Sequence, residues 1–67
     1  MSRFDIRVEN WLIRYKSITP MEAHKFFDME LKLLYSSIET LRIRKKWNIE
    51  RIKLKEYGYS KFTLIAT

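Results

Sequence analysis

The chain contains few of the residues that form loops and close small domains. Its 67 residues include one glycine, one proline and no cysteine. The lack of cysteine excludes a disulfide framework and a cysteine-based zinc site. Charged residues recur every two or three positions near the start of the chain, so we expect neither a signal peptide nor a membrane span there. These absences predict a cytoplasmic protein that does not act at a membrane.

Large apolar residues are abundant, with 46% hydrophobic and 15% aromatic residues. This composition favours a folded domain over a disordered segment. We expect one domain over residues 1–67, and a chain this short buries only a marginal core. We therefore predict that it forms a homodimer or requires a protein partner, with Ile6, Ile13 and Ile43 exposed.

The net positive charge comes from one part of the chain. Residues 1–41 contain six basic and six acidic residues, whereas residues 42–61 contain eight basic residues and two acidic ones, which account for the whole net charge of +6. Lysines scattered over the surface would leave both parts mildly positive. The asymmetry indicates one surface that binds a polyanion.

Apolar residues near the start follow helical spacing over about four turns. The stripe consists of Phe4, Val8, Trp11, Leu12 and Tyr15. A basic helix of this kind can also lie on a membrane, but Asp5 and Glu9 would be repelled by anionic lipid. We therefore expect the stripe to pack in the core.

The segment "SITPMEAHKFF" contains the only proline and predicts a second helix. Thr19 suits the N-cap, Pro20 the first helical position, and Glu22 the return bond of a capping box. Ser17 and Ile18 are expected to form a brief extended segment. The buried side of this helix is expected to be Ala23, Phe26 and Phe27.

A third helix is expected to follow Asp28, which suits either a turn or the N-cap of that helix. Two helices joined this tightly form a helix-turn-helix. The expected core side is Leu31, Leu34, Ile38, Leu41 and the stem of Lys45. The opposite side is expected to hold Lys32, Ser36, Glu39, Thr40 and Ile43, with Leu33 and Ser37 at its flank. Small hydroxyl side chains suit close approach to DNA, although a solvated helix surface would have the same composition.

Residues with a period of two near the end predict a β-hairpin. A loop of Tyr57, Gly58 and Tyr59 would pair Leu54 with Phe62 and Ile52 with Leu64. Lys55 would then lie opposite Lys61, an arrangement that is unfavourable without an anion. Three helices followed by a basic hairpin predict an α+β fold of the winged-helix type, with the third helix in the major groove and the hairpin along the phosphates.

The chain resembles the small helix-turn-helix and winged-helix proteins of bacteriophages and prophages. The matching segments are "SITPMEAHKFF", "IETLRIRKKWNI" and "YGYSKFTLI", over roughly residues 17–65. The resemblance implies a DNA-binding regulator in the cytoplasm of a bacterial host. The chain departs from the family at Asp28, where glycine is usual, at Ser37, where arginine is usual, and in a stretch from Glu22 to Ile38 about two residues longer than the family's.

The candidate residues for binding double-stranded DNA lie on the third helix and in the basic segment after it. They are Lys32, Ser36, Ser37, Thr40, Arg44, Lys45, Lys46, Arg51, Lys53, Lys55 and Lys61. No catalytic, metal or cofactor site is expected, because His24 has no partner ligand and Gly58 stands alone. Asp5 and Glu9 are expected to form surface salt bridges. We therefore predict a transcriptional or replication-associated regulator without enzymatic activity.

A different class of function stays open on the same fold, namely a small phage module that docks on and inhibits a host enzyme or nucleoprotein complex. Exposed Leu33 and Ile43 on the third helix favour a docking module. Glu39 favours it too, because its carboxylate would repel the phosphates of DNA. A weaker alternative is a binder of single strands that stacks bases on Tyr57, Tyr59 and Trp47.

Overall fold

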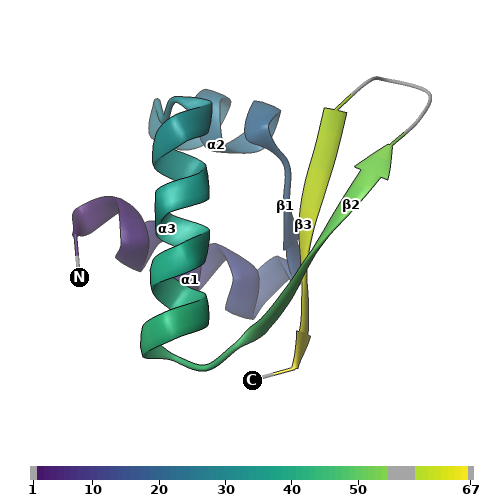
Figure 1. Ribbon diagram of the computed structural model, residues 1–67. Helices are drawn as coiled ribbons and strands as arrows, with labels where there is room; N and C mark the ends of the chain where they lie inside the picture. The colour runs from purple at the N-terminus through teal and green to yellow at the C-terminus, as the bar shows by residue number, and fades with distance from the viewer. Residues whose placement is uncertain (1, 55–58, 67) are drawn as a thin grey trace.

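The computed structural model describes residues 2–54 and 59–66, which form three helices and a three-stranded antiparallel sheet. The elements in chain order are α1 (Arg3–Tyr15), β1 (Ser17–Ile18), α2 (Pro20–Phe27), α3 (Leu31–Arg44), β2 (Asn48–Leu54) and β3 (Tyr59–Ala66). The strand order in the sheet is β1-β3-β2. The helices lie together on one side of the sheet, and α3 crosses in front of α1 (Figure 1). The predicted α+β class, with three helices before a hairpin, is confirmed.

Two helices begin with reciprocal capping boxes. At α2 the Glu22 backbone N–H donates to the Thr19 hydroxyl (3.1 Å), and the Thr19 backbone N–H donates to the Glu22 carboxylate (2.9 Å), as predicted. At α1 the same pattern joins Ser2 and Asp5. Each box satisfies two backbone donors that a helix start otherwise leaves unpaired.

The turn between α2 and α3 is made by Asp28 in the left-handed conformation, with φ of 55°. Its backbone N–H donates to the His24 carbonyl (3.0 Å), and the N–H of buried Met29 donates to the Ala23 carbonyl (3.2 Å). This geometry ends α2 and satisfies its last carbonyls. Asp28 is therefore a turn residue, and the N-cap of α3 is Glu30.

The core lies between the three helices and the inner side of the sheet. It consists of Val8, Leu12, Ile18, Ala23, Met29, Leu34, Ile38, Leu41, Ile49, Phe62 and Leu64. Three expected members are exposed instead, Phe26 (56%), Tyr15 (53%) and Leu31 (48%). Phe26 packs its ring against Trp11 from outside, and Met29 rather than Leu31 fills the core at the start of α3. Of the residues that the structure describes, no helix is long and apolar enough to cross a membrane.

The hairpin register differs from the predicted one by three residues. Phe62 pairs with Arg51, Leu64 pairs with Ile49, and Ile52 pairs with Lys61. An odd shift moves each side chain of β2 to the other face of the sheet, so Ile49 is buried and Ile52 is 37% exposed. The predicted pairing of Lys61 with Lys55 is wrong, because Lys61 lies opposite Ile52. Lys55 and the predicted turn residues Tyr57 and Gly58 lie outside the described residues, whereas Tyr59, also assigned to that turn, begins β3.

Candidate nucleic-acid interface

The third helix has a buried side and an exposed side, as predicted. Leu34, Ile38 and Leu41 are fully buried against the rest of the core. On the opposite side Lys32, Ser36, Glu39 and Ile43 are exposed, and Thr40 is half-buried. We call this exposed side, together with Arg44 and Lys46 at its end and Arg51 and Lys53 on β2, the α3 surface.

Ser37 does not belong to the α3 surface, because only 2% of it is exposed. It follows Leu34 by one helical turn and therefore points to the same side. Its hydroxyl acts on the buried carboxylate of Asp5 and lowers the pKa of that group. Burial raises the pKa of Asp5, but the Ser37 hydroxyl and the hydrogen bonds from Ser2 outweigh burial and hold the pKa below its ordinary value. The prediction of Ser37 as a DNA contact is therefore wrong, and so is that of Asp5 as a surface residue.

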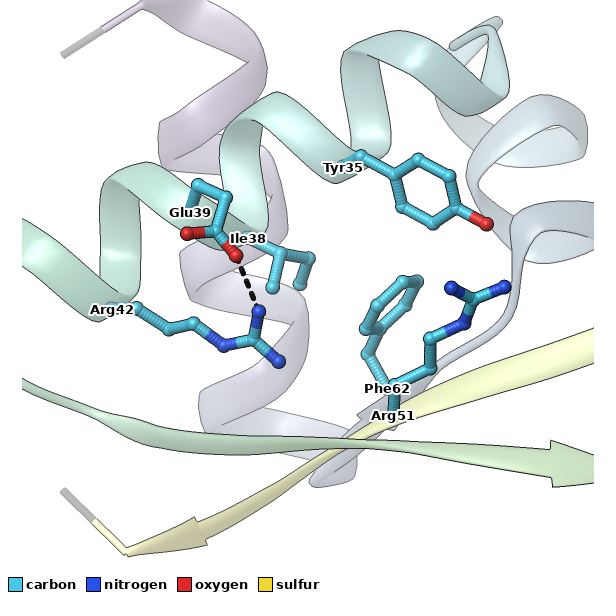
Figure 2. Close-up of a pocket in the computed structure, with 6 residues that line it drawn as sticks. All are labelled: Tyr35, Ile38, Glu39, Arg42, Arg51 and Phe62. Carbon is cyan, nitrogen blue, oxygen red and sulfur yellow. Dashed lines mark hydrogen bonds and ion pairs between the residues drawn. The ribbon is translucent and has the colours of Figure 1, made fainter.

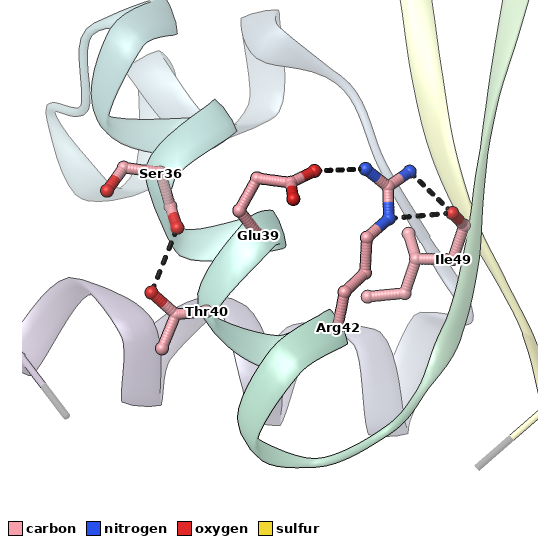
Figure 3. Close-up of polar contacts among 5 residues, drawn as sticks. All are labelled: Ser36, Glu39, Thr40, Arg42 and Ile49. Atoms are coloured by element: carbon pink, nitrogen blue, oxygen red, sulfur yellow. Dashed lines mark hydrogen bonds and ion pairs between the residues drawn. The ribbon is translucent and has the colours of Figure 1, made fainter.

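Ser36 and Thr40 lie one turn apart on α3. The Thr40 hydroxyl donates to the Ser36 backbone carbonyl at 3.0 Å (Figure 3). This bond uses the hydroxyl proton of Thr40 and leaves its oxygen lone pairs as acceptors. Figure 3 shows the Ser36 side chain on the outer side of the helix, away from the core. The two residues therefore present different hydrogen-bonding groups, with Thr40 an acceptor and Ser36 able to donate or accept.

The negative charge of Glu39 is compensated within the chain. Arg42 forms an ion pair with Glu39, and the same guanidinium donates to the Ile49 backbone carbonyl through Nε (3.1 Å) and Nη2 (2.6 Å) (Figure 3). Arg42 thus ties the end of α3 to the start of β2. The spacing i, i+3 on a helix signals the Glu39–Arg42 pair in the sequence, but the bonds to Ile49 depend on the tertiary fold.

A small cavity of about 180 Å³ separates α3 from β2. Its walls are Tyr35, Ile38, Glu39, Arg42, Arg51 and Phe62 (Figure 2). The Arg51 guanidinium lies over the Tyr35 ring, with its central carbon 5.3 Å from the ring centre, and its Nε donates to the Ser60 hydroxyl (3.1 Å). Arg51 is therefore held beside α3, and its Nη groups donate to no partner within residues 2–54 and 59–66. This contact places a cation of the hairpin next to the third helix.

The cations at the end of α3 have different environments. Arg44 and Lys46 are exposed. Lys45 forms an ion pair with Glu9 of α1, with 3.4 Å between Nζ and the carboxylate oxygen. Glu9 was predicted to form a salt bridge among the arginines of its own helix, but its partner in the structure is Lys45, whose charge is thus directed to α1. Lys45 was predicted to contact DNA, and the structure does not bring it onto the α3 surface.

The two described lysines of the hairpin lie on opposite faces of the sheet. Lys53 pairs with Ser60 and shares a face with Arg51, whereas Lys61 pairs with Ile52 on the other face. Lys61 is half-buried and Lys53 is exposed. The register of the hairpin therefore separates cations that the predicted register placed together.

No family model, curated protein or solved structure matches the chain. Over residues 2–54 and 59–66, no three His, Asp or Glu side chains gather where they could hold a metal ion. The resemblance to phage and prophage proteins therefore stays a prediction, and the function must be argued from the α3 surface itself.

Proposed function

We propose that the protein is a winged-helix protein that binds double-stranded DNA, with α3 in the major groove and the β2–β3 hairpin along the phosphate backbone. The order of the elements and the sheet order β1-β3-β2 support this assignment, as does the tight turn at Asp28 that joins α2 to α3. The protein acts as a phage-type transcriptional or replication-associated regulator, and its homodimer would supply two half-sites.

The observation that carries the proposal is that the α3 surface combines small hydroxyls with cations while its one acidic group is compensated. Glu39 would repel phosphate if it were free, but Arg42 pairs with it. The charges that remain on this surface are all positive, and they come from Lys32, Arg44, Lys46, Arg51 and Lys53. Such a surface attracts the DNA backbone through counterion release.

Each part of the α3 surface has a distinct role in this proposal. Ser36 and Thr40 contact base edges, because they are small and lie one turn apart on the exposed side of the helix. Arg44 and Lys46 contact phosphates at the end of the helix. Arg51 and Lys53 contact phosphates from the hairpin, and the position of Arg51 over Tyr35 keeps it beside the groove that α3 enters.

A docking module is the second candidate, and the exposure of two apolar side chains on α3 favours it. Ile43 is 69% exposed on the α3 surface, and Leu33 is exposed at its flank. In a docking module these side chains would carry most of the binding energy. Replacing both with serine would then abolish capture of the partner, and DNA binding would be weak and unselective.

The deciding experiment is a selection of bound duplexes from a random pool, followed by anisotropy titrations of the selected duplex at several salt concentrations. We expect a common sequence to be enriched, and we expect log affinity to fall with log salt by about 0.9 for each phosphate contact. A pool without a common sequence would contradict the sequence-specific regulator and leave the docking module as the better account.

A further inference from the structure

A second concave surface lies between α1 and α2, away from the α3 surface. It is a groove of about 320 Å³ whose walls are Arg7, Asn10, Trp11, Arg14, Tyr15 and Phe27. We call it the α1–α2 groove. Its floor is aromatic, because Trp11 packs on Tyr15 (ring centres 4.5 Å apart), and on Phe27 (5.6 Å). The exposed ring of Phe26 extends this aromatic surface.

Cations cover the faces of these rings. The guanidinium carbon of Arg7 lies 6.0 Å from the centre of the Phe27 ring, and that of Arg14 lies 5.4 Å from the centre of the Tyr15 ring. Neither arginine forms an ion pair within residues 2–54 and 59–66. A guanidinium placed over a ring without an acidic partner can still donate its N–H groups to an anion such as a carboxylate.

A ligand that fits the groove therefore combines an apolar group with negative charge. The apolar rings would accept a side chain, and the two arginines would accept carboxylates at its rim. Single-stranded nucleic acid fits less well, because it stacks bases on open ring faces, and here the Phe27 and Tyr15 rings carry guanidinium groups. Duplex DNA would offer phosphates but no apolar side chain.

The spacing of the two arginines indicates the shape of the ligand. Arg7 and Arg14 are seven residues apart on α1, which is about 10.5 Å along the helix axis. A second helix lying alongside α1 presents carboxylates at that distance when they are also seven residues apart. An apolar residue between them would then face the groove.

We infer that the α1–α2 groove binds an acidic amphipathic helix of a partner protein, with an apolar side chain against Trp11 and two carboxylates on Arg7 and Arg14. The sequence argues against a second copy as the occupant, because no two acidic residues of this chain are seven positions apart. The inference does not rest on DNA binding, since it uses no residue of the α3 surface.

The test is a titration of the protein with a set of defined peptides, monitored by NMR. The peptides are alanine-based helices of about 16 residues. Each has leucine or phenylalanine at the anchor position and a pair of Glu, Gln or Lys residues spaced by four or seven. We expect the Glu pair at spacing seven to bind most tightly. The Trp11 indole N–H, which donates to the Ser17 carbonyl (2.9 Å), should shift, and the Trp47 indole should not.

The matched variants are Arg7→Gln/Arg14→Gln in the groove and Arg44→Gln/Lys46→Gln on the α3 surface. The groove pair should weaken the best Glu peptide about tenfold, as two partly exposed ion pairs imply. The α3 pair should leave peptide affinity unchanged and weaken duplex DNA. Thermal unfolding monitored by circular dichroism should show that each variant is folded.

Five results would overturn the inference. Gln or Lys peptides could bind as tightly as the Glu peptide, or the groove variant could bind it as tightly as the natural chain. No peptide of the set could bind at concentrations up to about 1 mM. The groove variant could lose as much affinity for duplex DNA as for the peptide, and the groove would then be a nucleic-acid surface. Sedimentation could show that the groove variant loses self-association, which would make a second copy the occupant.

Discussion

The α3 surface and the α1–α2 groove both present cations, but the neighbours of those cations differ. On the α3 surface Lys32, Arg44 and Lys46 accompany small hydroxyl groups. In the groove Arg7 and Arg14 lie over aromatic rings. The first combination suits a polyanion with many phosphates, and the second suits a few carboxylates beside an apolar group. Net charge alone does not distinguish the two surfaces.

The same comparison shows why counting charge along the chain is incomplete. Residues 1–41 are neutral by count, yet the carboxylate of Asp5 is buried and that of Glu9 pairs with Lys45. Arg7 and Arg14 are therefore left without acidic partners among the described residues. A segment that is neutral by count can thus contain a basic groove in the fold.

Charge reversal on the α3 surface should have the largest effect on DNA binding. The triple variant Arg44→Glu/Lys46→Glu/Lys53→Glu should weaken both selected and random duplexes by similar factors, on the order of a hundredfold or more at low salt. Its log–log salt slope should fall by about 2.7, because three phosphate contacts are lost. Anisotropy titrations measure both quantities. Charge reversal of Arg7 and Arg14 serves as the control. An equal loss of DNA affinity in that control would contradict the assignment of different ligands to the two surfaces.

Removal of Arg42 should affect both stability and DNA binding. Arg42→Ala leaves the Ile49 carbonyl without its donor and Glu39 without its cation, so we expect a loss of about 1–3 kcal/mol in the free energy of unfolding. DNA affinity should also fall, because Glu39 then repels phosphate. Adding Glu39→Gln should restore DNA affinity but not stability. Urea denaturation and anisotropy together test this, and an Arg42→Ala variant as stable as the natural chain would remove the role assigned to Arg42.

The buried position of Ser37 predicts a loss of stability that depends on pH. Ser37→Ala removes the hydroxyl that lowers the pKa of Asp5 and should cost about 1 kcal/mol at neutral pH. Because the pKa of Asp5 is lower in the folded protein, its stabilising contribution is present above the unfolded pKa of about 3.9 and is lost as the pH falls through the folded value. The deficit of the variant should therefore shrink in acid. Urea denaturation across this pH range measures it, and a deficit independent of pH would contradict the contact.

The smallest effect on stability is expected at Ser36, the exposed neighbour of Ser37. Ser36→Ala should change the free energy of unfolding by no more than about 0.5 kcal/mol. If Ser36 contacts a base edge, the same change should cost about 1 kcal/mol in binding to the selected duplex and leave random duplexes almost unaffected. Equal losses on both duplexes would assign Ser36 to the phosphate backbone.

Local features of the fold were predictable from the sequence, and features that depend on distant contacts were not. The α2 capping box was predicted because it involves residues three positions apart in sequence. The turn at Asp28 was predicted only as one of two options. Aspartate tolerates its left-handed conformation better than most residues, so it can stand where the resembled family has glycine.

The hairpin register and the role of Ser37 were missed for physical reasons. The apolar alternation of β2 fits more than one register, and the pairing of Ile49 with Leu64 depends on where β2 begins after α3. Ser37 lies at the edge of the buried side of its helix, where helical spacing does not separate core from surface. Its partner Asp5 is more than thirty positions away in the sequence. Contacts between helices decide such flanking positions.

The most direct test of the central claim is an NMR titration of the labelled protein with the duplex obtained by selection. Binding by the α3 surface predicts that the backbone amide signals of Lys32, Ser36, Thr40, Lys46 and Lys53 shift. The Trp11 indole signal in the α1–α2 groove should stay in place. Shifts confined to the groove residues, or a selected duplex that moves no signal of α3, would contradict the assignment of α3 as the helix that enters the major groove.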